Sequence, residues 1–262
     1  MRAGLFPGQG SQTADMPLDT AGQQPAVLAA SIESWHSAAT TCDFLAGHSL
    51  GSYGALVAAG ALAPDAARRI VTVRGAAMSE AGKVQAGSML ALLGCTVERA
   101  SEVAAEFGLT VANDNAPGQV VISGPIAGIE RVELAEPTFS TEEGQERRIR
   151  LKRLPVSGAF HSSLMAPAAE QLQLAINSEV FGDGSRVIAN GTARPYVDPA
   201  TELAAELLLP VRWRETLEYL WQLGVREFVE FEPAGVLTGL VRRTLPEATA
   251  MKISDLVASE AN

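Results

Sequence analysis

A serine between two glycines, in the pentapeptide GHSLG at residues 47–51, is the first feature of this chain that could do chemistry. The G-x-S-x-G pattern is typical of a nucleophilic serine on a tight turn between a strand and a helix. The flanking residues fit, because CDFLAG before Ser49 has the character of a short strand and LGSYGALVAAG after it that of a helix. A chance glycine-rich turn is the alternative interpretation.

A nucleophilic serine needs a base, and histidine is the usual one. The chain has three histidines. His48 lies inside the pentapeptide and is expected to point away from Ser49, and His36 belongs to a polar helix face, where a surface position is favoured. His161, in LPVSGAFHSSLM, is left as the candidate base, although a lone histidine is more often structural. About a hundred residues follow His161, whereas the histidine of an α/β-hydrolase lies near the C-terminus, so the order argues against an esterase.

The predicted helix at residues 65–81 carries an arginine without an acidic neighbour. Arg68 and Arg69 follow Asp65 by three and four positions and are expected to pair with it. The neighbours of Arg74 at the same spacings are all apolar: Ile70, Val71, Ala77 and Met78. A buried arginine is costly unless an anion compensates it. Arg74 could have a tertiary partner, could extend to water, or could bind a substrate carboxylate in a bidentate manner. We favour the last alternative because the candidate nucleophile Ser49 lies upstream.

A glycine-rich turn, FPGQGSQ at residues 6–12, follows the first predicted strand at residues 2–6. It is either an ordinary turn into a helix or a source of backbone N–H groups. In the second case Gln9, together with the N–H of Leu50, could stabilise an oxyanion, and one such donor is worth about 2.7–4 kcal/mol in a transition state. No Gly-Lys-Ser/Thr follows, so the turn is not a Walker loop.

The whole chain has the composition of a globular protein, with 47% hydrophobic and 19% charged residues over 262 positions. A net charge of −10 argues against nucleic-acid binding. No run approaches the roughly 20 apolar residues of a membrane span, and the N-terminus reaches glycine and proline too soon for a signal peptide. Cys42 and Cys95 suggest neither a metal site nor a disulfide framework, so no metal and a cytoplasmic location are expected.

The fold class predicted from these patterns is α/β, with a hydrolase-like parallel-sheet core and an inserted ferredoxin-like small subdomain. Residues 1–86 and 156–262 contain the larger elements and would form the catalytic subdomain. Residues 87–155 show shorter units in the order βαββαβ, which is typical of a ferredoxin-like module. In the core, we expect helices at 25–41 and 65–81, the second ended by Gly82.

The insert is expected to end in a strand that contains RRIRLKR, residues 147–153, with five basic residues in seven. One interpretation is an edge strand whose basic side chains face water. The other is a local basic patch for an acidic substrate or partner, and the first is slightly favoured.

Several motifs together resemble one family. FPGQGSQ, GHSLG, VRG around Arg74, NDNAPGQVVISG and LPVSGAFHS occur in the order found in the malonyl-CoA:acyl carrier protein transacylases, the acyltransferases of fatty-acid and polyketide synthesis. PVRW and FVEFEPAGVLTGLVRR near the C-terminus also match. The resemblance runs from about residue 5 to residue 245 and agrees with the predicted fold.

The resemblance implies a ping-pong reaction. Ser49, activated by His161, would take malonyl from coenzyme A and pass it to the phosphopantetheine thiol of an acyl carrier protein. Gln9 and Leu50 would form the oxyanion hole, and Arg74 would hold the malonyl carboxylate. No cofactor is implied, since malonyl-CoA is a substrate, and a monomer is expected.

Three further positions are interpreted through the resemblance. Phe160, in GAFH, is similar to malonyl-selective members rather than methylmalonyl-selective ones. Family members often orient the histidine through a backbone carbonyl just before the P-V-x-W motif, where glutamine is common and this chain has Glu206; a main-chain contact would survive that change. Ser52 stands where a glutamate commonly follows GHSLG. The segment between residues 12 and 47 is also shorter than in typical members, which could open the acyl pocket or alter carrier docking.

Two other functions compete with malonyl transfer. A hydrolase that clears acyl groups from carrier thioesters would use the same serine, but a neutral acyl chain offers nothing to Arg74. A non-catalytic carrier-binding partner would need none of the residues that the chain retains: Ser49, His161, Gln9 and Arg74.

Overall fold

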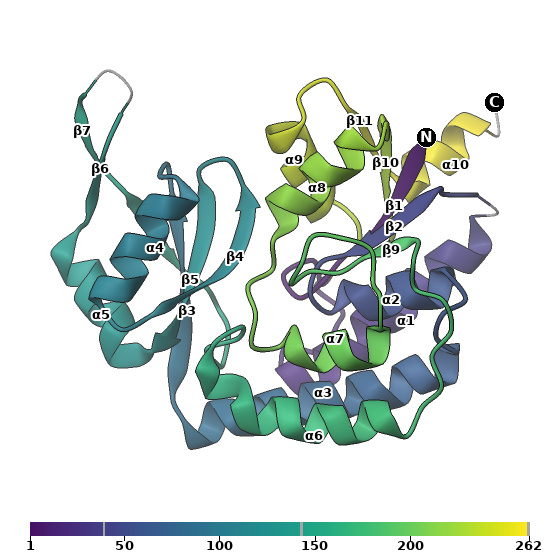
Figure 1. Cartoon of the computed structure of the whole chain (residues 1–262), viewed down its shortest axis with the longest axis horizontal. Helices are drawn as coiled ribbons and strands as arrows, with labels where there is room; N and C mark the ends of the chain where they lie inside the picture. The colour runs from purple at the N-terminus through teal and green to yellow at the C-terminus, as the bar shows by residue number, and fades with distance from the viewer. Residues whose placement is uncertain (39, 142–143, 261–262) are drawn as a thin grey trace.

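The computed structural model describes residues 1–38, 40–141 and 144–260. Its larger sheet has five strands in the order β11-β10-β1-β2-β9, and every neighbouring pair is parallel. Figure 1 shows this sheet on one side of the molecule and a smaller antiparallel sheet on the other. The bounds of the five strands are β1 Arg2–Phe6, β2 Phe44–Gly47, β9 Val187–Ile188, β10 Glu227–Glu230 and β11 Thr249–Lys252.

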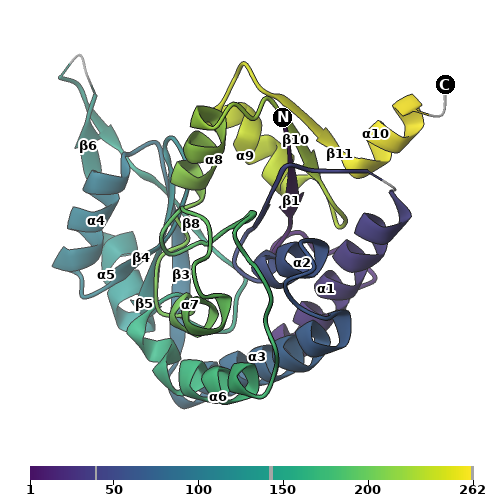
Figure 2. The same cartoon turned by 45° about the vertical axis from the view of Figure 1, so that its right-hand side comes forward.

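Alternate side chains of the parallel strands enter two different apolar clusters. Leu5 packs with α8 (Trp213–Gln222) and α9 (Val236–Thr244), whereas its neighbour Phe6 packs with the helices of the opposite face. Figure 2 shows α8 and α9 on one side of β1 and α1 and α2 on the other. Because successive residues of a strand point to opposite faces, a sheet covered on both sides needs apolar residues at nearly every position, as β1 and β2 have.

The two central strands end together, and this brings two glycine-rich turns side by side. Phe6 is paired with Gly47, so the turn after β1 and the GHSLG turn after β2 leave the same edge of the sheet. A Cβ atom on Gly51 would lie 2.0 Å from the carbonyl oxygen of Phe6. Only glycine permits this close approach of the two chain segments.

The first helix differs from its prediction. Helix α1 spans Thr20–Ser37, rather than residues 25–41, because the carboxylate of Asp19 accepts a hydrogen bond from the N–H of Gly22 and caps the helix. Pro25 therefore lies inside the helix. Helix α2 spans Gly51–Ala58 and begins directly after the serine turn.

The predicted stop of the next long helix at Gly82 is wrong. Helix α3 runs from Pro64 through Gly82 to Val84. A Cβ atom on Gly82 would lie 2.5 Å from the carbonyl oxygen of Ser157, so this glycine serves a close contact between α3 and the segment that leads to His161. Helix α6, Ala166–Asn177, packs beside α3 (Figure 1).

The smaller sheet has the predicted ferredoxin-like arrangement. Its strands are antiparallel in the order β4-β5-β3-β8, and helices α4 and α5 cover one face. The elements are β3 Gly87–Leu93, α4 Val97–Glu106, β4 Thr110–Ala116, β5 Gln119–Pro125, α5 Ile126–Ala135 and β8 Arg150–Arg153. The α/β fold class predicted from the sequence is therefore confirmed. We retain the division of the chain at residues 87 and 155 as a proposal.

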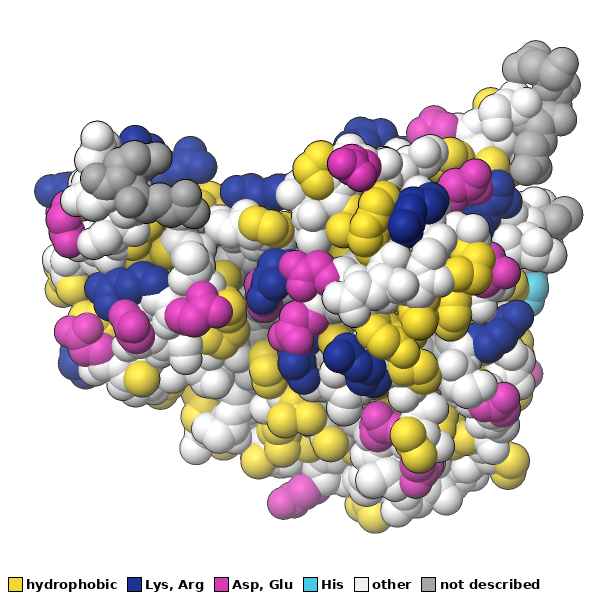
Figure 3. Space-filling view, turned by 45° about the horizontal axis from the view of Figure 1, so that its top comes forward, with side chains coloured by type: hydrophobic (Ala, Val, Ile, Leu, Met, Phe, Trp, Pro, Cys, Tyr) yellow, Lys and Arg dark blue, Asp and Glu magenta, His cyan; other side chains and the backbone are white. Residues whose placement is uncertain are grey.

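The sequence predicted a single strand over the basic run at residues 147–153. This is wrong, because the run belongs to two strands. Strand β7, Glu146–Arg148, pairs with β6, Thr138–Ser140, and the buried Ile149 separates it from the edge strand β8. Arg148 and Arg153 form ion pairs with Glu136 and Glu133. Figure 3 likewise shows basic side chains among acidic ones on the face that it displays. The run is therefore partly neutralised by its own neighbours.

The remaining elements come from the C-terminal half of the chain. A short 3₁₀ turn, Ser163–Met165, precedes α6, and helix α7 spans Pro199–Ala205. Helix α10, Ile253–Glu260, follows β11. Within the described ranges, no helix is both long and apolar enough to cross a membrane.

Candidate active site

Ser49 lies on a strained turn between β2 and α2. Its backbone φ is 52°, in the left-handed region that residues with side chains rarely adopt. The flanking glycines allow this turn, since a Cβ atom on Gly47 would lie 1.9 Å from the carbonyl carbon of Gly51. The N–H of Ser49 donates to Oδ1 of Asn190 across 3.1 Å. The geometry is that of a nucleophile held out from the backbone at the end of a sheet.

His161 contacts Ser49 directly. Its Nε2 lies 2.8 Å from Oγ of Ser49, and its Nδ1 lies 3.0 Å and 2.9 Å from the carbonyl oxygens of Glu206 and Leu209. Carbonyl oxygens only accept hydrogen bonds, so these contacts assign the ring proton to Nδ1 and leave Nε2 free to accept from the serine. Burial and the nearby charge of Arg74 lower the pKa of His161 to about 4, which keeps the ring neutral, with Nε2 unprotonated.

Arg74 lies in the same place, from the middle of α3. It is 4% exposed; its Nη1 donates to Oε1 of Gln24 across 2.7 Å, and its Nη2 donates to Oγ of Ser49 across 2.9 Å. Among the described residues no carboxylate forms an ion pair with it. Of the three alternatives, an extension to water is excluded by the burial. The tertiary partners found are neutral, and burial lowers the pKa of the guanidinium.

The other two arginines of α3 differ from Arg74. Arg68 pairs with Asp65, as predicted, at 2.6 Å. Arg69 was expected to join the same carboxylate, which is wrong: it binds Glu179 of the segment after α6 through two hydrogen bonds. Arg69 therefore pairs in a bidentate manner with Glu179, which is distant in the sequence, and not with the neighbouring Asp65.

A pair of adjacent glutamines on α1 was missed by the sequence analysis. Nε2 of Gln24 donates to Oε1 of Gln9 across 3.0 Å, and Nε2 of Gln9 donates to Oε1 of Gln23 across 2.9 Å. Gln24 is fully buried and accepts from Nη1 of Arg74, whereas Ser49 accepts from Nη2 of the same guanidinium. Its signal in the sequence was a glutamine on the same helix face as the apolar Val27 and Leu28.

The predicted oxyanion donors lie next to the serine turn. Within the part of the chain that the structure describes, the N–H groups of Gln9 and Leu50 have no protein partner. A Cβ atom on Gly8 would lie 2.3 Å from the carbonyl oxygen of His48, so the turn after β1 is in contact with the serine turn. Their role as an oxyanion hole stays a prediction.

Glu206 and Ser52, two of the three differences from the family pattern, meet at Asn190. Oε1 of Glu206 accepts from the N–H of Asn190 at 2.6 Å and from the hydroxyl of Tyr196 at 2.8 Å. Nδ2 of Asn190 lies 2.5 Å from Oγ of the fully buried Ser52. Burial raises the pKa of Glu206 to about 7. The sequence predicted a contact of Glu206 through its main chain, which the structure contains, but not this second contact through the side chain.

The remaining candidates lie farther from the reacting atoms. His48 turns away from Ser49, with Nε2 2.8 Å from Oδ1 of Asn115, and His36 is exposed on α1. Phe160 is buried beside His161 in the chain but does not line the cavity at Ser49. That cavity measures about 10 Å³ and is lined by Ser49, Tyr53, Arg74, His161, Leu203, Glu206 and Leu207. The described residues contain no group of three or more potential metal ligands.

Comparison with known proteins places this chain in a family. A model of the acyl transferase domain matches residues 19–260. The malonyl CoA-acyl carrier protein transacylase of Bacillus subtilis (strain 168) is 40% identical over 249 residues, which cover 90% of this chain and 76% of the relative.

Solved structures agree. The MCAT of Streptococcus pneumoniae is similar with a TM-score of 0.88 at 29% identity, over 99% of this chain and 100% of that chain. A malonyl-transacylase in complex with its holo type II polyketide-synthase acyl-carrier protein is similar with a TM-score of 0.85 at 30% identity, over 100% of this chain and 99% of that chain. With most of the chain matched by the domain model and a relative at 40% identity, the protein belongs to the acyl transferase family.

Proposed function

We propose that the protein transfers a malonyl group from coenzyme A to the phosphopantetheine thiol of an acyl carrier protein. The observation that carries this proposal is Arg74, a buried cation beside the candidate nucleophile and without a carboxylate partner among the described residues. A buried guanidinium whose hydrogen-bond partners are neutral favours a substrate that brings its own carboxylate. The named relatives are malonyl transacylases, and one of the similar structures contains a carrier protein.

In the first half-reaction, Oγ of Ser49 attacks the thioester carbonyl of malonyl-CoA as its proton passes to Nε2 of His161. The carbonyl oxygen becomes an oxyanion, which the N–H groups of Gln9 and Leu50 would stabilise. The intermediate collapses, the C–S bond breaks, and the coenzyme A sulfur takes the proton from His161. The product is a malonyl ester on Ser49 and free coenzyme A.

The second half-reaction reverses these roles. The carrier thiol gives its proton to His161 while its sulfur attacks the ester carbonyl, and Oγ of Ser49 leaves and recovers the proton. The Nδ1–H of His161 remains bonded to the carbonyl oxygens of Glu206 and Leu209 in both steps, which keeps Nε2 directed at the serine.

The acyl group must displace Arg74 before it can react. The cavity at Ser49 is about 10 Å³, close to the smallest space that holds a single water molecule. We infer that the substrate carboxylate draws the guanidinium away from Oγ of Ser49. This exchange opens the pocket and removes a hydrogen bond that weakens the nucleophile.

The deciding experiment follows intact masses. The protein is incubated with malonyl-CoA or acetyl-CoA, and holo acyl carrier protein is then added. A stable malonyl adduct that is absent in Ser49→Ala and is discharged onto the carrier supports the proposal. Rapid release of free malonate would indicate a thioester hydrolase, and the absence of any adduct would indicate a non-catalytic partner of the carrier.

A further inference from the structure

The carboxylate of Glu206 is a buried acceptor surrounded by donors. Oε1 accepts from the N–H of Asn190 at 2.6 Å, from the hydroxyl of Tyr196 at 2.8 Å and from the N–H of Gly191 at 3.5 Å. Oε2 lies 3.4 Å from Nδ2 of Asn190. Four donors directed at one side chain are the pattern of an ionised carboxylate, which only accepts.

These contacts continue to the nucleophile. Asn190 has one carbonyl oxygen and one NH₂ group in its side chain, and the NH₂ group faces Ser52 and Glu206. Oδ1 is thereby left to accept from the N–H of Ser49 at 3.1 Å. The orientation of the amide therefore depends on the acceptors behind it, and the N–H that it holds belongs to the residue with the strained φ of 52°.

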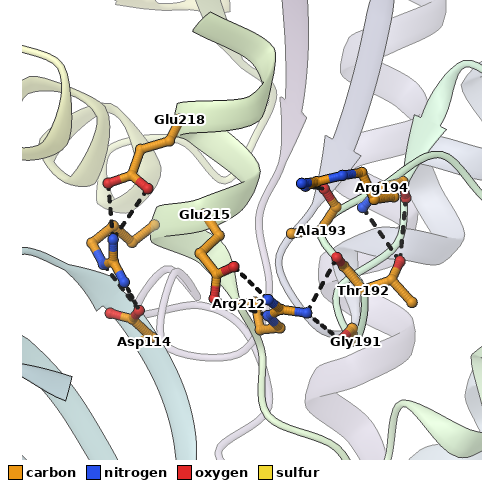
Figure 4. Close-up of polar contacts among 9 residues, drawn as sticks. Asp114, Gly191, Thr192, Ala193, Arg194, Arg212, Glu215 and Glu218 are labelled. Carbon is orange, nitrogen blue, oxygen red and sulfur yellow. Dashed lines mark hydrogen bonds and ion pairs between the residues drawn. The ribbon is translucent and has the colours of Figure 1, made fainter. Parts of the chain in front are cut away.

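The turn that carries Asn190 is held at its other end as well. Nη1 of Arg212 lies within hydrogen-bond distance of the carbonyl oxygens of Gly191 and Thr192, and Arg212 also binds Glu215 (Figure 4). Arg214 beside it binds Asp114 of the smaller sheet. Arg212 thus holds the outer side of the turn, and Glu206 contacts its inner side, which faces Ser49.

Ser52 and Glu206 approach Asn190 from two elements of the fold. Ser52 comes from the first turn of α2 and Glu206 from the end of α7, and both residues are buried. A glutamate in place of Ser52 would bring a second carboxylate to the same amide. Two buried carboxylates beside one amide disfavour each other's ionised form, so we expect the site to accommodate one.

We propose that Glu206 is a positioning residue whose side chain holds Ser49 through Asn190, and that a carboxylate at position 52 could take its place. The inference rests on the proposed use of Ser49 as a nucleophile, but it concerns the side chain of Glu206 and not its carbonyl group, which contacts His161. In this proposal the carboxylate of Glu206, which lines the cavity at Ser49, acts on the reaction through the orientation of one amide and not through contact with the substrate.

The test compares Glu206→Gln, a substitution of nearly the same shape, with Glu170→Gln on the exposed surface of α6. At pH 8, we expect the rate constant for acylation by malonyl-CoA to fall about tenfold in Glu206→Gln, because nucleophile placement is disturbed, while the dissociation constant stays within about twofold. Glu170→Gln should match the wild type in both. An unchanged rate constant for acylation in a folded Glu206→Gln variant would overturn the proposal, whether or not malonyl-CoA binds more weakly.

A fluorophosphonate probe separates this inference from the proposed function. The probe phosphonylates an activated serine with loss of fluoride and needs neither a carboxylate nor coenzyme A. Slower labelling of Ser49 in Glu206→Gln supports the positioning role even if malonyl-CoA is not the substrate. Equal labelling rates would overturn it even if malonyl transfer is confirmed.

The exchange of the carboxylate is tested by the double variant Ser52→Glu/Glu206→Gln. Melting temperatures first establish which proteins are folded. A folded double variant that labels faster than Glu206→Gln supports the exchange, because the carboxylate has returned to the amide from the other side. A folded double variant that is as slow as Glu206→Gln, or slower, contradicts it.

Discussion

Nη2 of Arg74 donates a hydrogen bond to Oγ of Ser49 across 2.9 Å, although the two residues are 25 positions apart, Ser49 on the turn before α2 and Arg74 in the middle of α3. The same guanidinium lowers the pKa of His161 through its charge, so one cation acts on both the nucleophile and the base. In the proposed reaction, this hydrogen bond weakens the serine oxygen as a nucleophile until the substrate carboxylate engages Arg74.

We expect Arg74→Ala to lose the preference for malonyl-CoA over acetyl-CoA. A charge-assisted hydrogen bond is worth about 1.5–3 kcal/mol, or roughly 10- to 150-fold, so the ratio of kcat/KM values should fall by that factor. Arg68→Ala, on the exposed side of the same helix, is the matched control. Competition between the two thioesters, read by intact mass, measures the ratio. An unchanged ratio in Arg74→Ala would sink the role of Arg74 as a carboxylate fork.

Gln24→Ala should weaken the preference for malonyl-CoA over acetyl-CoA while leaving the contacts of Ser49 in place. Gln24 accepts from Nη1 of Arg74, and its loss leaves a buried donor unpaired and the guanidinium free to turn. We expect selectivity for malonyl-CoA to fall about tenfold while acylation by acetyl-CoA is retained. Gln173→Ala on α6 is the control for loss of a glutamine elsewhere. Equal losses with both thioesters would show that Gln24 supports the serine turn instead.

The pH dependence of labelling should report the neutral state of His161. Its pKa is about 4, and the ionisable groups that act on it are Arg74 and His48, with Glu206 nearby. In Glu206→Gln, which removes the carboxyl group, labelling by the fluorophosphonate should stay constant from pH 8 to about pH 6 and fall as the pH passes through 4. Adding Arg74→Ala should move the acid limb to higher pH, because a positive charge that opposes protonation is removed. A limb near 6.5 in both proteins would contradict this.

The contribution of Glu206 to the stability of the folded protein should fall as the pH rises. Its pKa is about 7 in the folded protein against a usual 4.5, so the folded state binds more protons between these values. The contribution of this carboxyl group to stability therefore falls as the pH rises through that window, by on the order of 3 kcal/mol for a fully buried group. His161 acts in the opposite direction between pH 4 and 6.5, but it is present in both proteins.

The melting temperature of Glu206→Gln relative to the wild type should consequently increase from pH 5 to pH 8. Thermal unfolding followed by circular dichroism at both pH values measures this difference. A difference that does not change with pH would show that the carboxyl group keeps an ordinary pKa.

Gly82→Ala should destabilise the protein and slow acylation. The added methyl group would lie 2.5 Å from the carbonyl oxygen of Ser157, in the segment that leads to His161, and overpacking of this kind costs about 1–3 kcal/mol. Gly239→Ala in α9 is the control, since its Cβ atom would meet nothing within 4 Å and should stabilise the helix by about 0.4–1 kcal/mol. Urea denaturation of both variants measures the two signs. Equal stability would contradict the close contact at Gly82.

The sequence by itself determined the fold class, the family and three candidates of the site. Ser49, His161 and Arg74 could be found because their chemistry is conspicuous: a serine in a glycine turn, a histidine left by elimination and an arginine on an apolar stripe. The α/β order and the ferredoxin-like module followed from periodicity. Helix ends at Thr20 and Val84 did not, because the cap of Asp19 and the close contact of Gly82 depend on single hydrogen bonds and on packing.

Only the tertiary structure decided which polar residues support these three. Asn190 reaches Ser49 from 141 positions away because β9 pairs with β2, and nothing local in either segment predicts that register. Ser52 and Glu206 were two unrelated positions in the sequence, each singled out only by the family resemblance. They become one feature in the fold, because Ser52 in the first turn of α2 and Glu206 at the end of α7 both contact Asn190.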